Sequence, residues 1–255
     1  MIEFIIGLDV NILWLILAGF AAGFINTIAG GGTLLTLPAL IFMGLPPSIA
    51  NGTNRIAIFL QTAAGVAGFK SKGVTTFPFS IYCGLSALLG ALIGAKIAVD
   101  IKGETFNKIL AVIMIIVVLL IIFKPKLKAK ESLERTTGKF LWIAVITFFF
   151  LGIYGGFINA GIGFLMLIFM PYVNRMSLLR ANAAKVTIVC IYTFGAIIMF
   201  YLNDKINWKY GLILSIGNVS GAWISSRWSV KKDDNMIQMV LIVMIIVMAI
   251  KLWFF

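Results

Sequence analysis

The sequence predicts an all-α polytopic membrane protein composed of two inverted helical repeats, each with a broken or hairpin helix at a glycine-rich element. Charged residues make up only 12% of the chain and apolar residues 61%, whereas an ordinary soluble protein has about 25% charged residues. Long uncharged stretches recur, several of them near the ~20 residues that a membrane-spanning helix needs. One sequence pattern also occurs twice, which indicates two similar halves.

The repeated pattern is Gly-Phe-Ile-Asn followed twelve residues later by a proline. It occurs at residues 23–26 with Pro38 and again at residues 156–159 with Pro171. An Ala-Asn pair with a cationic residue soon after it also recurs in each half. Two apolar halves of this kind are what many transporters use to build one site at their interface.

Each half contains an uncharged stretch that is too long to cross the membrane as one helix. Residues 10–54 would be about 65 Å long as a single helix, about twice the hydrocarbon thickness. Three consecutive glycines, residues 30–32, mark the break, because glycine is costly in a helix interior. Residues 140–174 present the same problem, with Gly161 and Gly163 at the corresponding place. The predicted helices comprise residues 12–28, 33–43, 53–69, 76–96 and 106–123 in the first half, and residues 140–159 and 164–171 at the start of the second.

Positive charge orients the repeats, since short cytoplasmic loops carry an excess of Lys and Arg. The most basic segment is residues 124–139, which we predict to be a cytoplasmic linker between a first repeat, residues 1–123, and a second repeat, residues 140–255. If each broken helix returns to its starting side, the repeats are inverted and both termini lie opposite the linker. If each broken stretch crosses once, the repeats are parallel. The inverted arrangement places more basic residues in the cytoplasm, and we prefer it.

The glycine breaks predict an anion site. A break within the membrane frees backbone groups, which are tolerated only where they are buried in protein or line a cavity. A helix beginning near Thr33 would direct unpaired N–H groups and its positive dipole end at the centre, and a matching helix would begin near Phe164. The alternative is that the glycines only allow close packing. Packing is the better explanation for the pairs at four-residue spacing, namely Gly19 with Gly23, Gly90 with Gly94, Gly152 with Gly156, and Gly217 with Gly221.

Two cations stand beside long apolar runs at nearly equivalent points of the halves, Arg55 and Lys185. A charge costs about 2.5 to 3.5 kcal/mol at the centre of a membrane helix. Either the two cations balance a bound anion, which their equivalence favours, or they lie at helix ends and reach the headgroups. Nearby polar residues either bind substrate oxygens or join helices, at about 0.6 kcal/mol each. The candidate substrate-binding residues are Asn26, Gly30, Gly31, Gly32, Thr33, Asn51, Thr53, Arg55, Gln61, Asn159, Gly161, Gly163, Asn182 and Lys185.

Other classes of function are disfavoured by what the sequence lacks. Every carboxylate occupies a predicted loop or helix end, so no acid pair is available for general acid–base catalysis in the membrane. The chain has no histidine, and Cys83 and Cys190 lie in apolar segments without a CxxC spacing. We therefore expect neither an enzyme nor a metal or cofactor. The net charge of +12 reflects membrane topology and requires no nucleic-acid partner.

The segment GGGTLLTLPALIFMGLPPSIANGTN, residues 30–54, resembles the first repeat of the sulfite exporter (TauE/SafE) family. The shared features are a glycine cluster, an apolar run with proline, a Gly-Leu-Pro turn and an Ala-x-Gly-Thr element, in that order. The second half departs from this pattern, because residues 161–164 replace the glycine cluster and residues 181–184 replace the Gly-Thr element. The resemblance implies a transporter of sulfite, sulfonates or related small anions in the prokaryotic inner membrane.

Together these observations predict a secondary transporter that carries a small anion, sulfite or an organosulfonate, by alternating access around a site at the membrane midplane. The expected partners are the anionic substrate and the lipid bilayer, and the sequence neither requires nor excludes a homodimer. Two alternatives stay open. One is a passive anion channel, and the other is a membrane enzyme or assembly subunit that transports nothing.

Overall fold

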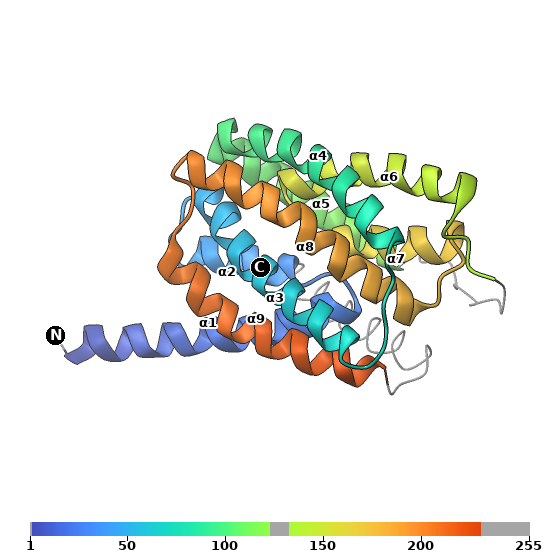
Figure 1. The fold of residues 1–255 in the computed structure, drawn as a ribbon. Helices are drawn as coiled ribbons and strands as arrows, with labels where there is room; N and C mark the ends of the chain where they lie inside the picture. The colour runs from blue at the N-terminus through green and yellow to red at the C-terminus, as the bar shows by residue number, and fades with distance from the viewer. Residues whose placement is uncertain (1, 123–132, 231–255) are drawn as a thin grey trace.

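The structure is a computed structural model that describes residues 2–122 and 133–230, and within these ranges every regular element is a helix (Figure 1). The helices of the first half are α1 (Ile2–Ile28), α2 (Thr33–Phe42), α3 (Pro47–Lys70), α4 (Phe79–Asp100) and α5 (Gly103–Ile122). Those of the second half are α6 (Gly138–Phe157), α7 (Ile162–Val173), α8 (Leu178–Leu202) and α9 (Trp208–Ser229).

Both predicted helix breaks are confirmed. The first separates α1 from α2 at residues 29–32, and the second separates α6 from α7 at residues 158–161. Gly30 in the first break and Asn159 and Gly161 in the second have φ angles of 88°, 59° and 70°. This left-handed backbone ends a helix and turns the chain, and glycine adopts it at the least cost. Gly163, which we expected at the break, lies instead in the first turn of α7.

Two helices, α1 and α3, begin well before the predicted residues, whereas the other predicted starts lie within three residues of the observed ones. The helix α1 begins at Ile2 rather than at residue 12, so Glu3 and Asp9 lie within it. The helix α3 begins at Pro47 rather than at residue 53. Proline suits the first helical position, where its missing N–H would have no partner and its φ angle is already helical.

The two halves pack on each other through corresponding helix pairs. The helix α1 packs along α9 as α6 packs along α4, and α3 packs on α9 as α8 packs on α4. The helices α3 and α8 contact each other in the middle of the bundle. In Figure 1, α1 runs from left to right whereas its counterpart α6 runs from right to left. Exchanging α1, α3 and α4 with α6, α8 and α9 therefore reproduces these contacts.

Glycines at four-residue spacing line both outer seams, as predicted. A Cβ atom at Gly23 of α1 would overlap the backbone oxygen of Asn218, and one at Gly221 of α9 would overlap that of Phe20. At the α4–α6 seam, a Cβ atom at Gly90 would overlap the backbone oxygen of Phe149. Small residues thus let the backbones of neighbouring helices touch, which is the usual way of packing helices in lipid.

The distribution of buried and exposed residues is that of a membrane protein. Trp14 and Trp142 are each 67% exposed, whereas many polar residues are buried between the helices. Among the described helices, α4, α6 and α8 are long and apolar enough to cross a membrane. An apolar outer surface around a polar interior fits a lipid environment.

We expect Gly90→Ala to lower the free energy of unfolding by about 1 to 3 kcal/mol, because the added methyl group forces α4 and α6 apart. Thermal unfolding in detergent would measure this. Gly103→Ala is the matched control, since a Cβ atom there lies 3.5 Å from Pro47, at ordinary contact distance. Equal stability of the two variants would contradict the close backbone contact at the α4–α6 seam.

Candidate functional site

The two helix breaks meet at the centre of the bundle. Gly30 in the first break contacts Gly163 at the start of α7 so closely that a Cβ atom on either residue would overlap the backbone of the other. The contact joins segments from opposite halves of the chain. The N-terminal end of α7 therefore abuts the first break, as the sequence predicted for a matching helix start near Phe164.

Arg55 and Asn51, on α3, bind the C-terminal end of α6. The Arg55 guanidinium donates hydrogen bonds to the backbone oxygens of Gly155 and Gly156, the latter at 2.9 Å. Asn51 Nδ2 donates to the backbone oxygen of Phe157 at 2.8 Å, and Asn51 Oδ1 accepts from Arg55 Nη2 at 3.2 Å. The last carbonyls of a helix lack partners within the helix, and its C-terminal end carries partial negative charge. Arg55 supplies both hydrogen bonds and the opposite charge.

Lys185, on α8, does the same for the C-terminal end of α1. Its Nζ atom donates to the backbone oxygens of Asn26 at 2.8 Å and Thr27 at 2.9 Å, and to Asn182 Oδ1 at 2.7 Å. A lysine ammonium has three N–H donors, and each has an acceptor here. Each cation thus holds the broken helix of the other half.

Burial decides between the two interpretations of these cations that the sequence left open. Arg55 is 0% exposed and Lys185 is 2% exposed, so neither reaches the headgroups. Within the described residues, the ion pairs are Lys108 with Glu104 and Arg180 with Glu134, and neither involves the two buried cations. The centre therefore contains two buried basic side chains whose hydrogen-bond acceptors are neutral backbone and amide oxygens.

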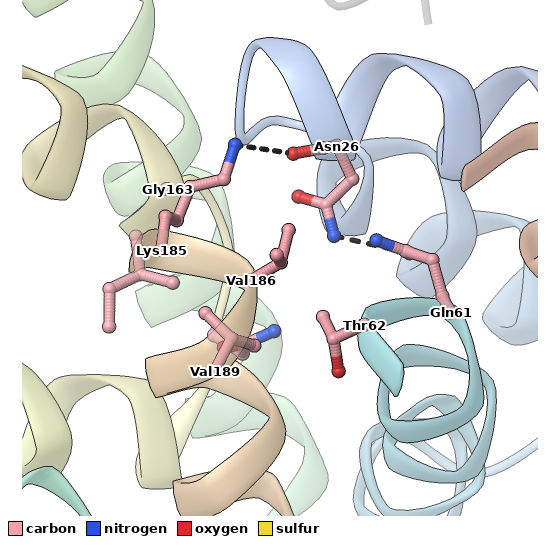
Figure 2. A pocket seen from close by; sticks show the side chains of 9 residues that line it. Asn26, Gln61, Thr62, Gly163, Lys185, Val186 and Val189 are labelled. Atoms are coloured by element: carbon pink, nitrogen blue, oxygen red, sulfur yellow. Dashed lines mark hydrogen bonds between the residues drawn. The ribbon is translucent and has the colours of Figure 1, made fainter. Parts of the chain in front are cut away.

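A small cavity lies beside Lys185 between α1, α3, α7 and α8 (Figure 2). Its free space is enough for about one water molecule. Asn26 Nδ2 donates to Gln61 Oε1 at 3.2 Å on one side of it. Gln61 Nε2 is buried and has no hydrogen-bond partner in the described part of the chain. The cavity is lined by Asn26, Gln61, Thr62, Asn159, Ile162, Gly163, Lys185, Val186 and Val189.

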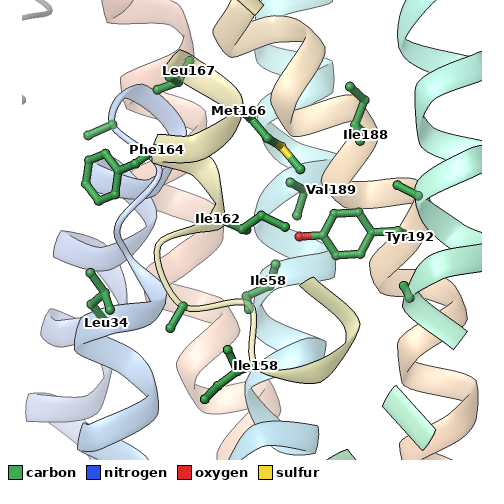
Figure 3. Close-up of a cluster of buried hydrophobic side chains, with 14 of the residues drawn as sticks. Leu34, Ile58, Ile158, Ile162, Phe164, Met166, Leu167, Ile188, Val189 and Tyr192 are labelled. Atoms are coloured by element: carbon green, nitrogen blue, oxygen red, sulfur yellow. The ribbon is translucent and has the colours of Figure 1, made fainter. Parts of the chain in front are cut away.

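Tyr192 occupies the corresponding place in the second half. It follows Asn182 by ten residues, as Gln61 follows Asn51 by ten. The Tyr192 hydroxyl donates to Asn159 Oδ1, while Asn159 Nδ2 donates to Thr33 Oγ1 at 3.3 Å. Figure 3 shows the Ile162 side chain directed at the Tyr192 hydroxyl group. An aromatic ring thus fills the second half where the first half has a polar cavity.

Five of the predicted site residues lie together at this cavity: Asn26, Gln61, Asn159, Gly163 and Lys185. Three others do not line the cavity but contact groups next to it. Asn51 and Arg55 bind the C-terminal end of α6, and Asn182 accepts a hydrogen bond from Lys185. Their role in binding a substrate stays a prediction.

The remaining predicted residues shape the breaks or lie elsewhere. Gly30, Gly31 and Gly32 form the first break together with Ala29, Thr33 begins α2, and Gly161 caps α7. Thr53 is separate, because its hydroxyl accepts a hydrogen bond from the backbone N–H of Asn207 at 2.8 Å, next to α9. The lining residues that sequence reasoning missed are Thr62, Ile162, Val186 and Val189, and it also missed Tyr192. The ten-residue spacing from the repeated Ala-Asn pair was the signal that could have found Tyr192.

The fold and the site define a class: a helical membrane protein in which two broken helices meet at a buried, positively charged centre. Residues 15–252 match the family described as "Sulfite exporter TauE/SafE". The chain belongs to this family.

Relatives match over nearly the whole chain. A "Probable membrane transporter protein" of Haemophilus influenzae is 28% identical over 247 residues, covering 97% of this chain and 96% of its own. "Probable membrane transporter protein ORF9" of Sinorhizobium sp is 28% identical, covering 94% and 91%. "Probable membrane transporter protein YfcA" of Escherichia coli K12 is 26% identical, covering 91% and 85%. No solved structure matches the chain.

We expect Arg55→Met to lower the free energy of unfolding by at least about 2 kcal/mol, because two buried carbonyl groups of α6 would lose their donors. Unfolding in detergent would measure the change. Lys102→Met, at an exposed position, is the control and should leave stability nearly unchanged. A stable Arg55→Met protein would mean that the contact with α6 contributes little.

Proposed function

We propose that the protein is a secondary transporter of a small anion, sulfite or an organosulfonate, and that it works by alternating access around the central cavity. The family description names sulfite export, and the relatives are named as membrane transporters. These names describe transport and no chemical reaction, which disfavours the enzyme and assembly-subunit alternatives. One observation carries the proposal. Lys185, a buried cation without a carboxylate partner among the described residues, lies at a polar cavity between the two helix breaks.

Lys185 provides the charge that selects an anion. A helix dipole contributes only about 0.3 to 1 kcal/mol to anion binding at exposed sites and up to ~2 when partly buried. An anion that leaves water needs more, and a charge-assisted hydrogen bond is roughly twice as strong as a neutral one. An anion would become the third acceptor of the ammonium by replacing Asn182 Oδ1, and Asn182 Nδ2 has no partner among the described residues to resist that exchange.

Neutral groups around the cavity complete the proposed site. The buried Gln61 Nε2 is a free donor, and the start of α7 at Gly163 presents backbone N–H groups next to it. Asn26 and Asn159 add amide groups from the two repeated Gly-Phe-Ile-Asn motifs. Arg55, which binds the C-terminal end of α6, contributes a second fixed positive charge.

The size of the cavity favours a carrier over a passive channel. Space for about one water molecule is less than a sulfite ion occupies, so binding requires the surrounding helices to move apart. A channel would instead need a continuous open path. A carrier would show saturable uptake into proteoliposomes and counterflow of labelled sulfite against unlabelled sulfite.

Inverted repeats give such a carrier its two access states. The exchange of helix contacts between the halves and the opposite directions of α1 and α6 in Figure 1 support inversion. The predicted cytoplasmic linker lies mostly in residues 123–132, outside the described residues, as do residues 231–255 of the second repeat. The cytoplasmic position of the linker, the placement in a bacterial inner membrane and a homodimeric assembly stay predictions.

We expect Lys185→Gln to weaken sulfite binding about 10- to 100-fold, because a hydrogen bond to a charged group contributes about 1.5 to 3 kcal/mol. The half-saturation concentration for uptake into proteoliposomes would measure this, with activity normalised to folded protein. Lys185→Arg keeps the charge and should retain part of the activity. Lys209→Gln, at an exposed position, is the matched control. Unchanged affinity in Lys185→Gln would remove this residue from the anion site.

A further inference from the structure

A second cavity lies at the end of α3, on the side of the loop that leads to α4. Lys70 and Thr75 are exposed at its edge, whereas Thr76 and Thr187 are buried within it. A lysine ammonium with neighbouring hydroxyl groups attracts anions and raises their local concentration. The cavity is lined by Val66, Phe69, Lys70, Val74, Thr75, Thr76, Phe77, Ala183 and Thr187.

Both cavities follow the interface between α3 and α8. Along α3, Gln61 and Thr62 line the central cavity, and Val66 and Phe69 line the outer one. Along α8, Lys185, Val186 and Val189 line the central cavity, and Ala183 and Thr187 line the outer one. The two cavities are therefore successive spaces along one helix–helix interface.

The side chains between the two cavities are apolar. Phe69 and Val186, each 1% exposed, form one buried cluster with Ala183, and Val66 packs against it. Val186 lines the central cavity and Phe69 lines the outer one. This apolar cluster thus lies between the proposed anion site and a cavity with an exposed lysine at its edge.

The other end of the interface is closed by the corresponding phenylalanine. Phe200 follows Tyr192 by eight residues, as Phe69 follows Gln61 by eight. Both carbonyl groups accept a hydrogen bond from the turn that follows, Phe69 from the Val74 N–H at 3.1 Å and Phe200 from the Lys205 N–H at 2.9 Å.

The Phe200 end has additional contacts. The Phe200 ring lies 5.6 Å from Arg55 Cζ, and the Lys205 backbone oxygen lies against Gly52, where a Cβ atom would overlap it. Arg55 is in turn bound to α6, so opening this end would disturb the hydrogen bonds at the second helix break. Among the described residues, the Phe69 end is closed by the apolar cluster of Phe69, Ala183 and Val186.

We propose that the anion path runs along the α3–α8 interface, with Phe69 and Val186 as the gate on one side of the central cavity and Phe200 as the gate on the other. That an anion uses this path rests on the proposed function. The gates themselves are independent of it, because they control access of any small water-soluble molecule to the central cavity. A cavity lies on the outer side of the Phe69 gate.

Thiol labelling tests the gates without a substrate. In a background with Cys83→Ala and Cys190→Ala, single substitutions Thr75→Cys and Val189→Cys place one thiol at the exposed edge of the outer cavity and one in the central cavity. A charged, membrane-impermeant methanethiosulfonate should modify Thr75→Cys readily and Val189→Cys slowly. Adding Val186→Ala or Phe69→Ala should speed modification of Val189→Cys by about tenfold or more, since a barrier of side chains is removed.

The side of access gives the decisive comparison. Phe69→Ala should speed labelling from one face of the membrane only, and Phe200→Ala from the opposite face only. Phe148→Ala is the matched control, since this buried phenylalanine of α6 packs on Phe169 away from the interface. Unchanged rates in both Phe69→Ala and the milder Val186→Ala, or acceleration by Phe69→Ala and Phe200→Ala from the same face, would overturn the gates. Absence of sulfite uptake with intact side-specific labelling would overturn the proposed substrate and leave the gates standing.

Discussion

The need to satisfy backbone groups at a helix end inside the membrane governs this structure. Lipid offers no hydrogen bonds, so a helix that stops there must find partners for its last carbonyl groups within the protein. Arg55 and Lys185 provide them for α6 and α1. The cost of burying two cations is offset by the negative ends of the helices that they bind. The partners of the broken helices and the burial of the two cations are consequences of the same backbone requirement.

The reciprocity of these contacts joins the two halves. Arg55 comes from the first half and binds the second, whereas Lys185 comes from the second and binds the first. Separation of the halves would leave carbonyl groups of both breaks without donors. The glycine seams between α1 and α9 and between α4 and α6 bring the backbones of these helices into contact.

The sequence predicts those features that depend on chain geometry. The breaks follow from uncharged stretches too long for one crossing, and the seams follow from glycines four residues apart. The partners of the cations could not be predicted, because sequence places Arg55 on α3 without saying that α6 ends beside it. Tyr192 and Val186 were missed because apolar and aromatic residues in a membrane helix carry no distinguishing signal. Thr53 was assigned to the site because of its neighbours in sequence, yet its side chain faces the start of α9.

The two halves differ at the centre of the bundle, where the first half has Gln61 and the second has Tyr192 at the corresponding position. A centre with identical residues in both halves would offer a polar cavity in each. The Tyr192 ring leaves one polar cavity and packs where a Cβ atom on Gly155 would lie 3.0 Å from the ring carbon Cζ. The chain is therefore asymmetric at its centre, with a polar cavity beside Gln61 and an aromatic ring at the corresponding position of the second half.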